Sequence, residues 1–249
     1  QTTPTPPMTV SILITRPRPA ADTFAGRVRE RLGVGVPVVV SPLIRIAPLP
    51  DALPALSGTG ALVITSAHAA ALVAQAPEAA GLPCYCVGAA TARAARAAGL
   101  DAVEGGGTAE ALTRRIIADA PPGPVLYPRG EHVASELAQT LRNAGVEAHE
   151  AVIYRQEAKP LSKAATELLA GASPVVVPLF SPRTARLFFD AAPFRAPLLV
   201  AAISRNAAQA VTTSVHCRIA QRPDADSMLD TVATLASHAN RVESGAGPQ

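Results

Sequence analysis

Small polar residues recur in this sequence with one spacing. Ser66 lies 25 residues before Thr91, Ser181 lies 25 residues before Asn206, and the second pair follows the first at an offset of 115 residues. Each residue follows an apolar run and stands where a helix is expected to begin. Hydroxyl and amide groups beside the free N–H groups of a helix start can bind a carboxylate or a phosphate. Taken singly, Ser66 and Ser181 are most simply helix N-caps.

Arginines also fall at the expected ends of strands. Ile14-Thr15-Arg16-Pro17 and Tyr127-Pro128-Arg129-Gly130 open two halves of the chain at nearly the same offset as the polar pairs. Surface arginines are normally only solvated, but a guanidinium group binds a carboxylate through two hydrogen bonds. Arginines at five equivalent strand ends therefore indicate an acidic ligand: Arg16, Arg18, Arg129, Arg183 and Arg205.

Tyr154 is the candidate for proton transfer. It is one of only three tyrosines and lies in the extended segment Val152-Ile153-Tyr154-Arg155. A phenol that faces a ligand could donate a proton to a leaving group. The alternative, that the ring only packs beneath a hinge between domains, is equally open.

Other motifs exclude several chemistries. Gly105-Gly106-Gly107-Thr108 resembles a phosphate cradle without the Lys-Ser/Thr of a nucleotide P-loop, so an anion site and a plain flexible turn are both open. No G-x-G-x-x-G indicates a dinucleotide site. His68 lies near Ser66 without the G-x-S-x-G of a serine hydrolase, and Glu131-His132 lacks the second histidine of a zinc helix motif. We therefore infer no metal site from these motifs.

The elements that position these residues alternate between short apolar strands and helices. This alternation predicts right-handed βαβ crossovers and doubly wound parallel sheets of the flavodoxin-like α/β type, in which ligands lie beyond the carboxyl ends of the strands. Strands are expected at 10–15, 36–46 (one kinked strand), 61–65, 83–87, 102–104, 125–127, 147–155, 175–180, 198–203 and 215–220. Helices are expected at 22–32, 51–56, 67–75, 90–98, 108–118, 135–143, 163–169, 184–191, 206–211 and 227–236.

Two extended segments interrupt the alternation and predict two domains. Residues 41–46 and 149–155 are read as a two-stranded β-ladder that connects the domains. The first domain is then discontinuous, with residues 9–40 plus 156–236, and the second spans 47–148. Residues 1–8 and 237–249 are expected to be tails. The repeated edges predict one ligand-binding cleft between the two domains.

Composition narrows the function classes. A formal charge of +3 with 3% aromatic residues, and no cluster of Lys and Arg interleaved with aromatics, argues against nucleic acid. No apolar run approaches the length of a membrane span. Three cysteines at spacings that fit neither disulfides nor zinc predict buried, reduced thiols and a cytoplasmic location. A monomer is the simplest expectation.

At these residues the chain resembles the uroporphyrinogen-III synthase family over about residues 12–235. The order and spacing of several weak motifs make the similarity specific: Thr15-Arg16-Pro17, Thr65-Ser66, Val87-Gly88-x-x-Thr91-Ala92, Tyr127-Pro128-Arg129-Gly130, Val152-Ile153-Tyr154-Arg155, Phe180-Ser181-Pro182, Ala202-Ile203-Ser204, Arg222-Pro223 and Met228-Leu229.

This resemblance implies a fold, a reaction and a set of site residues. The family has two α/β domains joined by a two-stranded ladder and uses no cofactor or metal. It converts linear hydroxymethylbilane, a small-molecule substrate with eight carboxylates, into uroporphyrinogen III with inversion of ring D and loss of water. Tyr154 is the implied acid. The implied substrate-binding residues are Arg16, Thr65, Ser66, Gly88, Thr91, Arg129, Ser181, Ser204 and Asn206.

A second function class fits the same predicted cleft. A non-enzymatic two-domain sensor could close on a small anionic ligand and signal by domain motion. Such a sensor is expected to have a partner-binding patch or a DNA-binding module, and neither is visible in the sequence.

Overall fold

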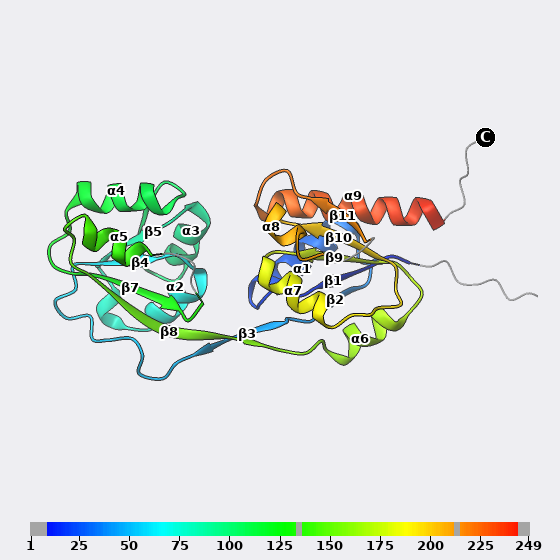
Figure 1. Ribbon diagram of the computed structural model, residues 1–249, viewed down its shortest axis with the longest axis horizontal. Coiled ribbons are helices and arrows are strands. Elements are labelled where there is room, and N and C mark those ends of the chain that lie inside the picture. The colour runs from blue at the N-terminus through cyan, green and yellow to red at the C-terminus, as the bar shows by residue number, and fades with distance from the viewer. Residues whose placement is uncertain (1–8, 133–135, 212–214, 244–249) are drawn as a thin grey trace, which may run out of the picture. The chain divides into compact units, whose positions relative to one another are not determined.

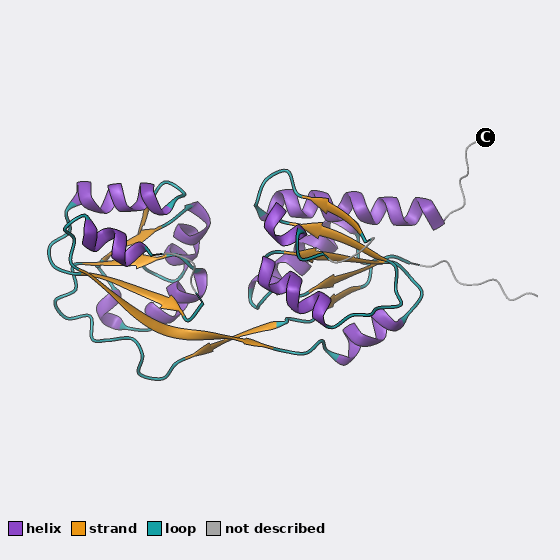
Figure 2. Ribbon diagram, in the orientation of Figure 1, coloured by secondary structure: helices purple, strands orange, loops and turns teal. Residues whose placement is uncertain are grey.

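The computed structural model describes residues 9–132, 136–211 and 215–243 (Figure 1). The chain forms two compact units. Unit 1 contains the residues up to Arg45 and those from Ala158 onward, and unit 2 contains Ile46–Glu157. Both are α/β units with a sheet between layers of helices, so the predicted fold class is confirmed (Figure 2).

Unit 1 contains a five-stranded sheet in the order β11-β10-β9-β1-β2, and all neighbouring strands are parallel. Numbered along the chain within the unit, this is the order 2-1-3-4-5 of a flavodoxin-like sheet. The strands are β1 (Ser11–Ile14), β2 (Val38–Val40), β9 (Val175–Leu179), β10 (Leu198–Ala202) and β11 (His216–Ile219).

Helices cover both faces of the unit 1 sheet. One face packs against α1 (Ala20–Leu32) and α9 (Ala225–Glu243) through a core that includes Phe24 and Met228. The other packs against α6 (Lys163–Ala170) and α7 (Pro182–Asp190), with Phe188 in its core, and α8 (Arg205–Ala208) contacts α7. Because both faces are covered, the strands are continuous apolar runs with buried residues on both sides.

Unit 2 contains a six-stranded sheet in the order β3-β8-β7-β4-β5-β6, in which the five strands from β8 to β6 are parallel. The strands are β3 (Ile44–Pro48), β4 (Ala61–Ile64), β5 (Pro83–Cys86), β6 (Asp101–Glu104), β7 (Val125–Gly130) and β8 (Ala148–Ala158). The boundary between the units falls within β3 and near the end of β8.

Unit 2 is also a three-layer unit. Helices α2 (Ala67–Val73) and α3 (Ala89–Ala97) pack on one face, and the short 3-10 helix η1 (Pro77–Ala79) contributes Ala79 to the same core. Helices α4 (Ala109–Asp119) and α5 (Leu137–Asn143) pack on the other face (Figure 1). The core on that face includes Tyr127.

The two sheets share one arrangement read from different starting strands. If counting in unit 2 begins at β7, the order β8-β7-β4-β5-β6 is again 2-1-3-4-5. Strand β7 then corresponds to β1, β4 to β9, and β5 to β10. This correspondence explains why the polar residues after β4 and β5 repeat after β9 and β10 at a constant offset in sequence.

Three sequence-based predictions are wrong. Residues 36–46 are two strands in different sheets, because Pro42 lacks the N–H that a continuous strand would need. Residues 51–56 form no helix, since Asp51 has a left-handed backbone (φ 54) and Pro54 cannot donate. The last helix does not end at 236, because Ala239 is also buried in the core of unit 1 and α9 continues to Glu243. Part of the region predicted as a C-terminal tail is therefore helical.

Some predictions fall on residues that the structure does not describe. These are Ser135 at the start of the helix predicted for 135–143, and the ends at 1–8 and 244–249. The described part of that helix is α5, from Leu137.

Candidate functional site

The carboxyl edge of the unit 1 sheet is formed by the turns after β1, β9 and β10. Ser181 caps α7: its Oγ accepts a hydrogen bond from the Thr184 backbone N–H (3.1 Å) and donates to Thr184 Oγ1 (2.9 Å). Ser204 caps α8 by accepting from the Ala207 N–H at 3.2 Å. The N-cap role predicted for Ser181 is therefore confirmed, and Ser204, which the family resemblance assigns to substrate binding, is also an N-cap. Asn206 is an exposed residue of α8, and no hydrogen bond to its side chain occurs within the described chain.

Arg16 lies at the same edge, immediately after β1. Its guanidinium carbon is 3.8 Å from the ring centroid of Phe180, which follows β9. This contact is expected from the parallel pairing of β1 with β9, in which Ile12 lies opposite Val176 and the same register brings Arg16 opposite Phe180. Burial lowers the pKa of Arg16 to about 10. The group therefore stays charged at neutral pH although it is partly withdrawn from water.

The corresponding edge of unit 2 has caps of the same kind. Ser66 caps α2 by accepting from the His68 N–H at 3.1 Å. Gly88 stands at the N-cap of α3 with an extended backbone, and Thr91 lies in the first turn of that helix, half-buried. The predicted strand-turn-helix positions are therefore confirmed, while ligand binding by these residues stays a prediction.

The glycine-rich turn before α4 has a packing reason. A Cβ at Gly105 would lie 2.8 Å from the Cys86 carbonyl oxygen and 2.3 Å from Leu112 Cδ1, so only glycine fits. Gly107 has φ +91, which other residues rarely adopt. Thr108 caps α4 by accepting from the Ala111 N–H at 3.1 Å. These contacts account for the glycines as a tight turn without any ligand.

Thr65 and Tyr127 form a buried polar pair in unit 2. The two hydroxyls are 3.0 Å apart, and Tyr127 has no exposed surface. Burial raises the pKa of Tyr127, and the hydrogen bond from Thr65 only partly opposes this. The Thr65 hydroxyl, which the sequence predicts to bind substrate, is thus already hydrogen-bonded within the protein.

Tyr154 lies against Gly130 at the end of β7. The β7–β8 register shifts between Arg129 and Gly130, so that Gly130 lies opposite Tyr154. A Cβ at Gly130 would be 2.6 Å from Tyr154 Cε2 and 3.0 Å from its hydroxyl oxygen. The glycine therefore leaves the space that the phenol occupies. A β-bulge changes which way the following side chains point, and here it selects the position of Tyr154.

His68 is the second neighbour of Tyr154. The two ring centroids are 6.0 Å apart with an interplanar angle of 65°. Tyr154 is only 4% exposed and belongs to the core beside α2 and α3. The packed-ring interpretation matches this placement, while the role as proton donor stays a prediction.

Arg129 differs from Arg16, its counterpart by topology. Its Nη1 donates to the Gly130 carbonyl oxygen at 3.1 Å, and its Nε lies 3.5 Å from Glu150 Oε1 on β8. That Nε is buried without a hydrogen bond, so the contact with Glu150 is an ion pair at long range. A carboxylate of the protein thus already neutralises much of the charge of Arg129.

The structure brings the sequence-predicted residues to two edges, one in each unit. Arg16, Ser181, Ser204 and Asn206 follow strand ends in unit 1, and Thr65, Ser66, Gly88, Thr91 and Arg129 lie at strand ends in unit 2. Sequence reasoning missed Gly130, Glu150 and Phe180 as functional neighbours, because their partners are set by strand register.

Comparison with known proteins decides the family. The family model described as uroporphyrinogen-III synthase HemD matches residues 24–230, which is most of the chain. The chain belongs to this family.

Solved structures agree with the HemD family fold. A uroporphyrinogen-III synthetase from Helicobacter pylori is 17% identical, with 91% of this chain and 100% of that chain covered and a TM-score of 0.64. A mutant uroporphyrinogen III synthase from Thermus thermophilus is 19% identical, with 92% and 99% covered and a TM-score of 0.53. At such low identity these structures support the two-domain α/β fold. No curated protein sequence matches the chain at a significant level.

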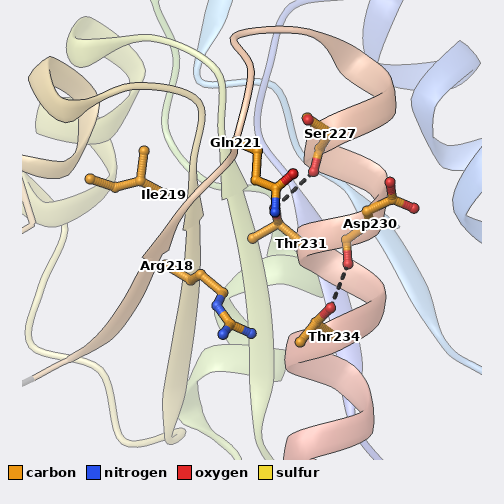
Figure 3. A pocket seen from close by; sticks show the side chains of 7 residues that line it. All are labelled: Arg218, Ile219, Gln221, Ser227, Asp230, Thr231 and Thr234. Atoms are coloured by element: carbon orange, nitrogen blue, oxygen red, sulfur yellow. Dashed lines mark hydrogen bonds between the residues drawn. The ribbon is translucent and has the colours of Figure 1, made fainter.

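A further hollow in this HemD-family chain lies beside β11 and α9 in unit 1 (Figure 3). Its volume is about 280 Å³, and its lining includes Arg218, Gln221 and Thr231. The helix hydroxyls in its wall are already engaged, since Thr231 Oγ1 donates to the Ser227 carbonyl at 2.8 Å and Thr234 Oγ1 to the Asp230 carbonyl at 2.9 Å. None of its lining residues was predicted from sequence.

The described part of this HemD-family chain contains neither a candidate metal cluster nor a helix that could span a membrane. Residues 9–132, 136–211 and 215–243 contain no group of three or more His, Cys, Asp or Glu that could hold a metal ion. Within the same ranges no helix is long and apolar enough to cross a membrane. Cys84 and Cys86 are buried free thiols, as predicted, and Cys217 is half-buried.

Proposed function

We propose that this chain is a uroporphyrinogen-III synthase, which cyclises hydroxymethylbilane to uroporphyrinogen III with inversion of ring D and loss of water. Membership of the HemD family over residues 24–230 is the observation that supports this most strongly. The strand-end positions of the predicted substrate-binding residues in both units support it further.

The carboxylates of the proposed substrate account for the donor groups at the carboxyl edges of the two sheets. A linear tetrapyrrole with eight carboxylates needs many donors, and helix N-termini, serine hydroxyls and arginines supply them. Several donors are backbone groups or are shared with caps, as at Ser66 and Ser181. Binding is therefore spread over many weak contacts.

Tyr154 is the proposed acid. The hydroxyl of hydroxymethylbilane leaves as water once it receives a proton, and the electron-rich pyrrole stabilises the cation that forms. The protein then has to fold the chain so that the reacting carbons meet, which removes most of the entropic barrier. A weak acid suffices for the first step. Gly130 and His68 fix the phenol ring, so the proton is presented from one place.

The proposed activity is tested by identifying which ring isomer of the product the protein forms. The purified protein is incubated with hydroxymethylbilane, and the product is oxidised and separated by ring isomer. We expect isomer III at a rate above that of spontaneous closure. Isomer I alone, at the spontaneous rate, would contradict the proposal and favour a non-enzymatic binder of anionic ligands.

A further inference from the structure

The guanidinium group of Arg16 lies over an aromatic ring at the edge of unit 1. It lies 3.8 Å from the centroid of the Phe180 ring. Phe180 is itself fixed by Phe24, whose ring meets it edge-on at 4.9 Å and 81°. A cation stacked on an aromatic face leaves its N–H edge free for a planar partner.

The charge of Arg16 has no acidic partner in the described chain. Neighbouring arginines do have one, since Arg18 pairs with Asp22 and Arg27 with Asp226. Burial lowers the pKa of Arg16, which shows that its charge has lost part of its hydration. A partly buried charge without a counter-ion is unfavourable unless a ligand supplies one.

The topologically equivalent arginine of unit 2 lacks these properties. Arg129 has Glu150 at 3.5 Å and also donates to the Gly130 carbonyl. The formal charges of the two units, counted from the sequence, differ in the same direction. Unit 1 has fifteen Lys and Arg against eight Asp and Glu, a formal charge of +7, whereas unit 2 has seven against eleven, a charge of −4.

We infer that Arg16 and Phe180 form a carboxylate subsite in unit 1, and that this subsite anchors one acetate or propionate side chain of the tetrapyrrole. Arg16 binds the carboxylate through its N–H groups, and Phe180 holds the guanidinium group in place. Arg129 does not have this role. The inference rests on the proposed function for the identity of the carboxylate. It assigns different roles to Arg16 and Arg129, which the sequence analysis predicted to have the same role.

The experiment compares four variants with the wild type. Arg16→Gln removes the charge, Arg16→Lys keeps the charge without the planar fork, and Phe180→Leu keeps an apolar contact without the flat ring. Arg31→Gln is the matched control, because Arg31 is an exposed arginine of the same unit that pairs with Asp230 at 3.5 Å. Folding is checked by circular dichroism and thermal unfolding.

Two readouts are needed. The first is steady-state kinetics with hydroxymethylbilane, where we expect Arg16→Gln to raise KM about 10- to 100-fold, as for loss of a charge-assisted hydrogen bond, with a smaller effect on kcat. Arg16→Lys and Phe180→Leu should fall between Arg16→Gln and the wild type, and Arg31→Gln should match the wild type. The second readout is calorimetric binding of uroporphyrin III, an octacarboxylate, at low and high salt.

The outcomes separate the inference from the proposed function. If the wild type makes isomer III and Arg16→Gln behaves like Arg31→Gln in both readouts, the subsite is wrong and the function stands. If the wild type makes only isomer I but binds uroporphyrin III through Arg16, the subsite stands without the enzyme. If the wild type makes only isomer I and Arg16→Gln leaves uroporphyrin III binding unchanged, both are overturned.

Discussion

The two sheet edges have the same strand order and opposite chemistry. In unit 1, Arg16 after the first strand of the topology lies over the Phe180 ring and has no carboxylate partner among the residues that the structure describes. In unit 2, the equivalent Arg129 is paired with Glu150, and the neighbouring position is occupied by a buried tyrosine. A repeated topology thus provides equivalent backbone positions with different side chains, and we propose ligand anchoring for the edge of unit 1 and proton transfer for the edge of unit 2.

The largest effect is expected when the Tyr154 hydroxyl is removed from unit 2. Tyr154→Phe should lower kcat about 10²- to 10⁴-fold, the usual range for a lost general acid, with KM little changed. Tyr85→Phe is the control, because that phenol donates instead to Asp119 at 3.0 Å. Steady-state kinetics on both variants give the comparison, and an unchanged kcat in Tyr154→Phe would remove the acid role.

The next effect tests how Tyr154 is positioned. Gly130→Ala should lower kcat by about 10²-fold, because the new Cβ would displace the phenol ring by part of an ångström or more. Gly26→Ala serves as the control, since a Cβ there meets nothing within 4 Å. Kinetics and a crystal structure of the variant check this. A variant with full activity and an unmoved Tyr154 would show that the space is not limiting.

A smaller effect is expected from a substitution that leaves Arg129 of unit 2 without its acidic partner, as Arg16 is in unit 1. Glu150→Gln leaves Arg129 without its carboxylate, so a polyanionic substrate should bind more tightly, with KM lower by about two- to fivefold at low salt. The gain should disappear at high ionic strength. A higher KM would mean that Glu150 itself contacts the substrate.

The smallest effect concerns the buried hydroxyl pair of unit 2. Tyr127→Phe should lower the free energy of unfolding at pH 8 by about 1 kcal/mol, because Thr65 then loses its partner. The raised pKa of Tyr127 favours the protonated phenol in the folded state, so its contribution is complete below the ordinary tyrosine pKa and is lost as pH rises through the folded value. Urea unfolding at pH 8 and above pH 10 should therefore show a narrowing gap between the two proteins. A gap that widens with pH would contradict this sign.

The sequence was sufficient for most of the elements and for the edge positions, although not for residues 36–46, residues 51–56 or the end of the last helix. Apolar runs closed by Ser66 or Ser181 predict strand-turn-helix units correctly, because a strand buried on both faces and an N-cap are local signals. The constant offset between Thr91 and Asn206 likewise reflects the shared strand order. These features depend on residues close together in the chain.

Contacts between distant segments could not be predicted in this way. The ring of Tyr154 lies over Gly130 only because the β7–β8 register shifts by one residue, and no local pattern signals that shift. The same holds for Glu150 beside Arg129 and for Arg16 over Phe180. Sequence reasoning therefore treated Arg16 and Arg129 as equivalent, and the difference is set by tertiary contacts.

A time course of the ring isomers formed from hydroxymethylbilane, with wild type and Tyr154→Phe side by side, tests the account most directly. The account predicts predominantly isomer III from the wild type and a mixture dominated by isomer I from Tyr154→Phe, because spontaneous closure overtakes the slowed enzyme. Isomer I from both proteins, at the rate of buffer alone, would contradict it.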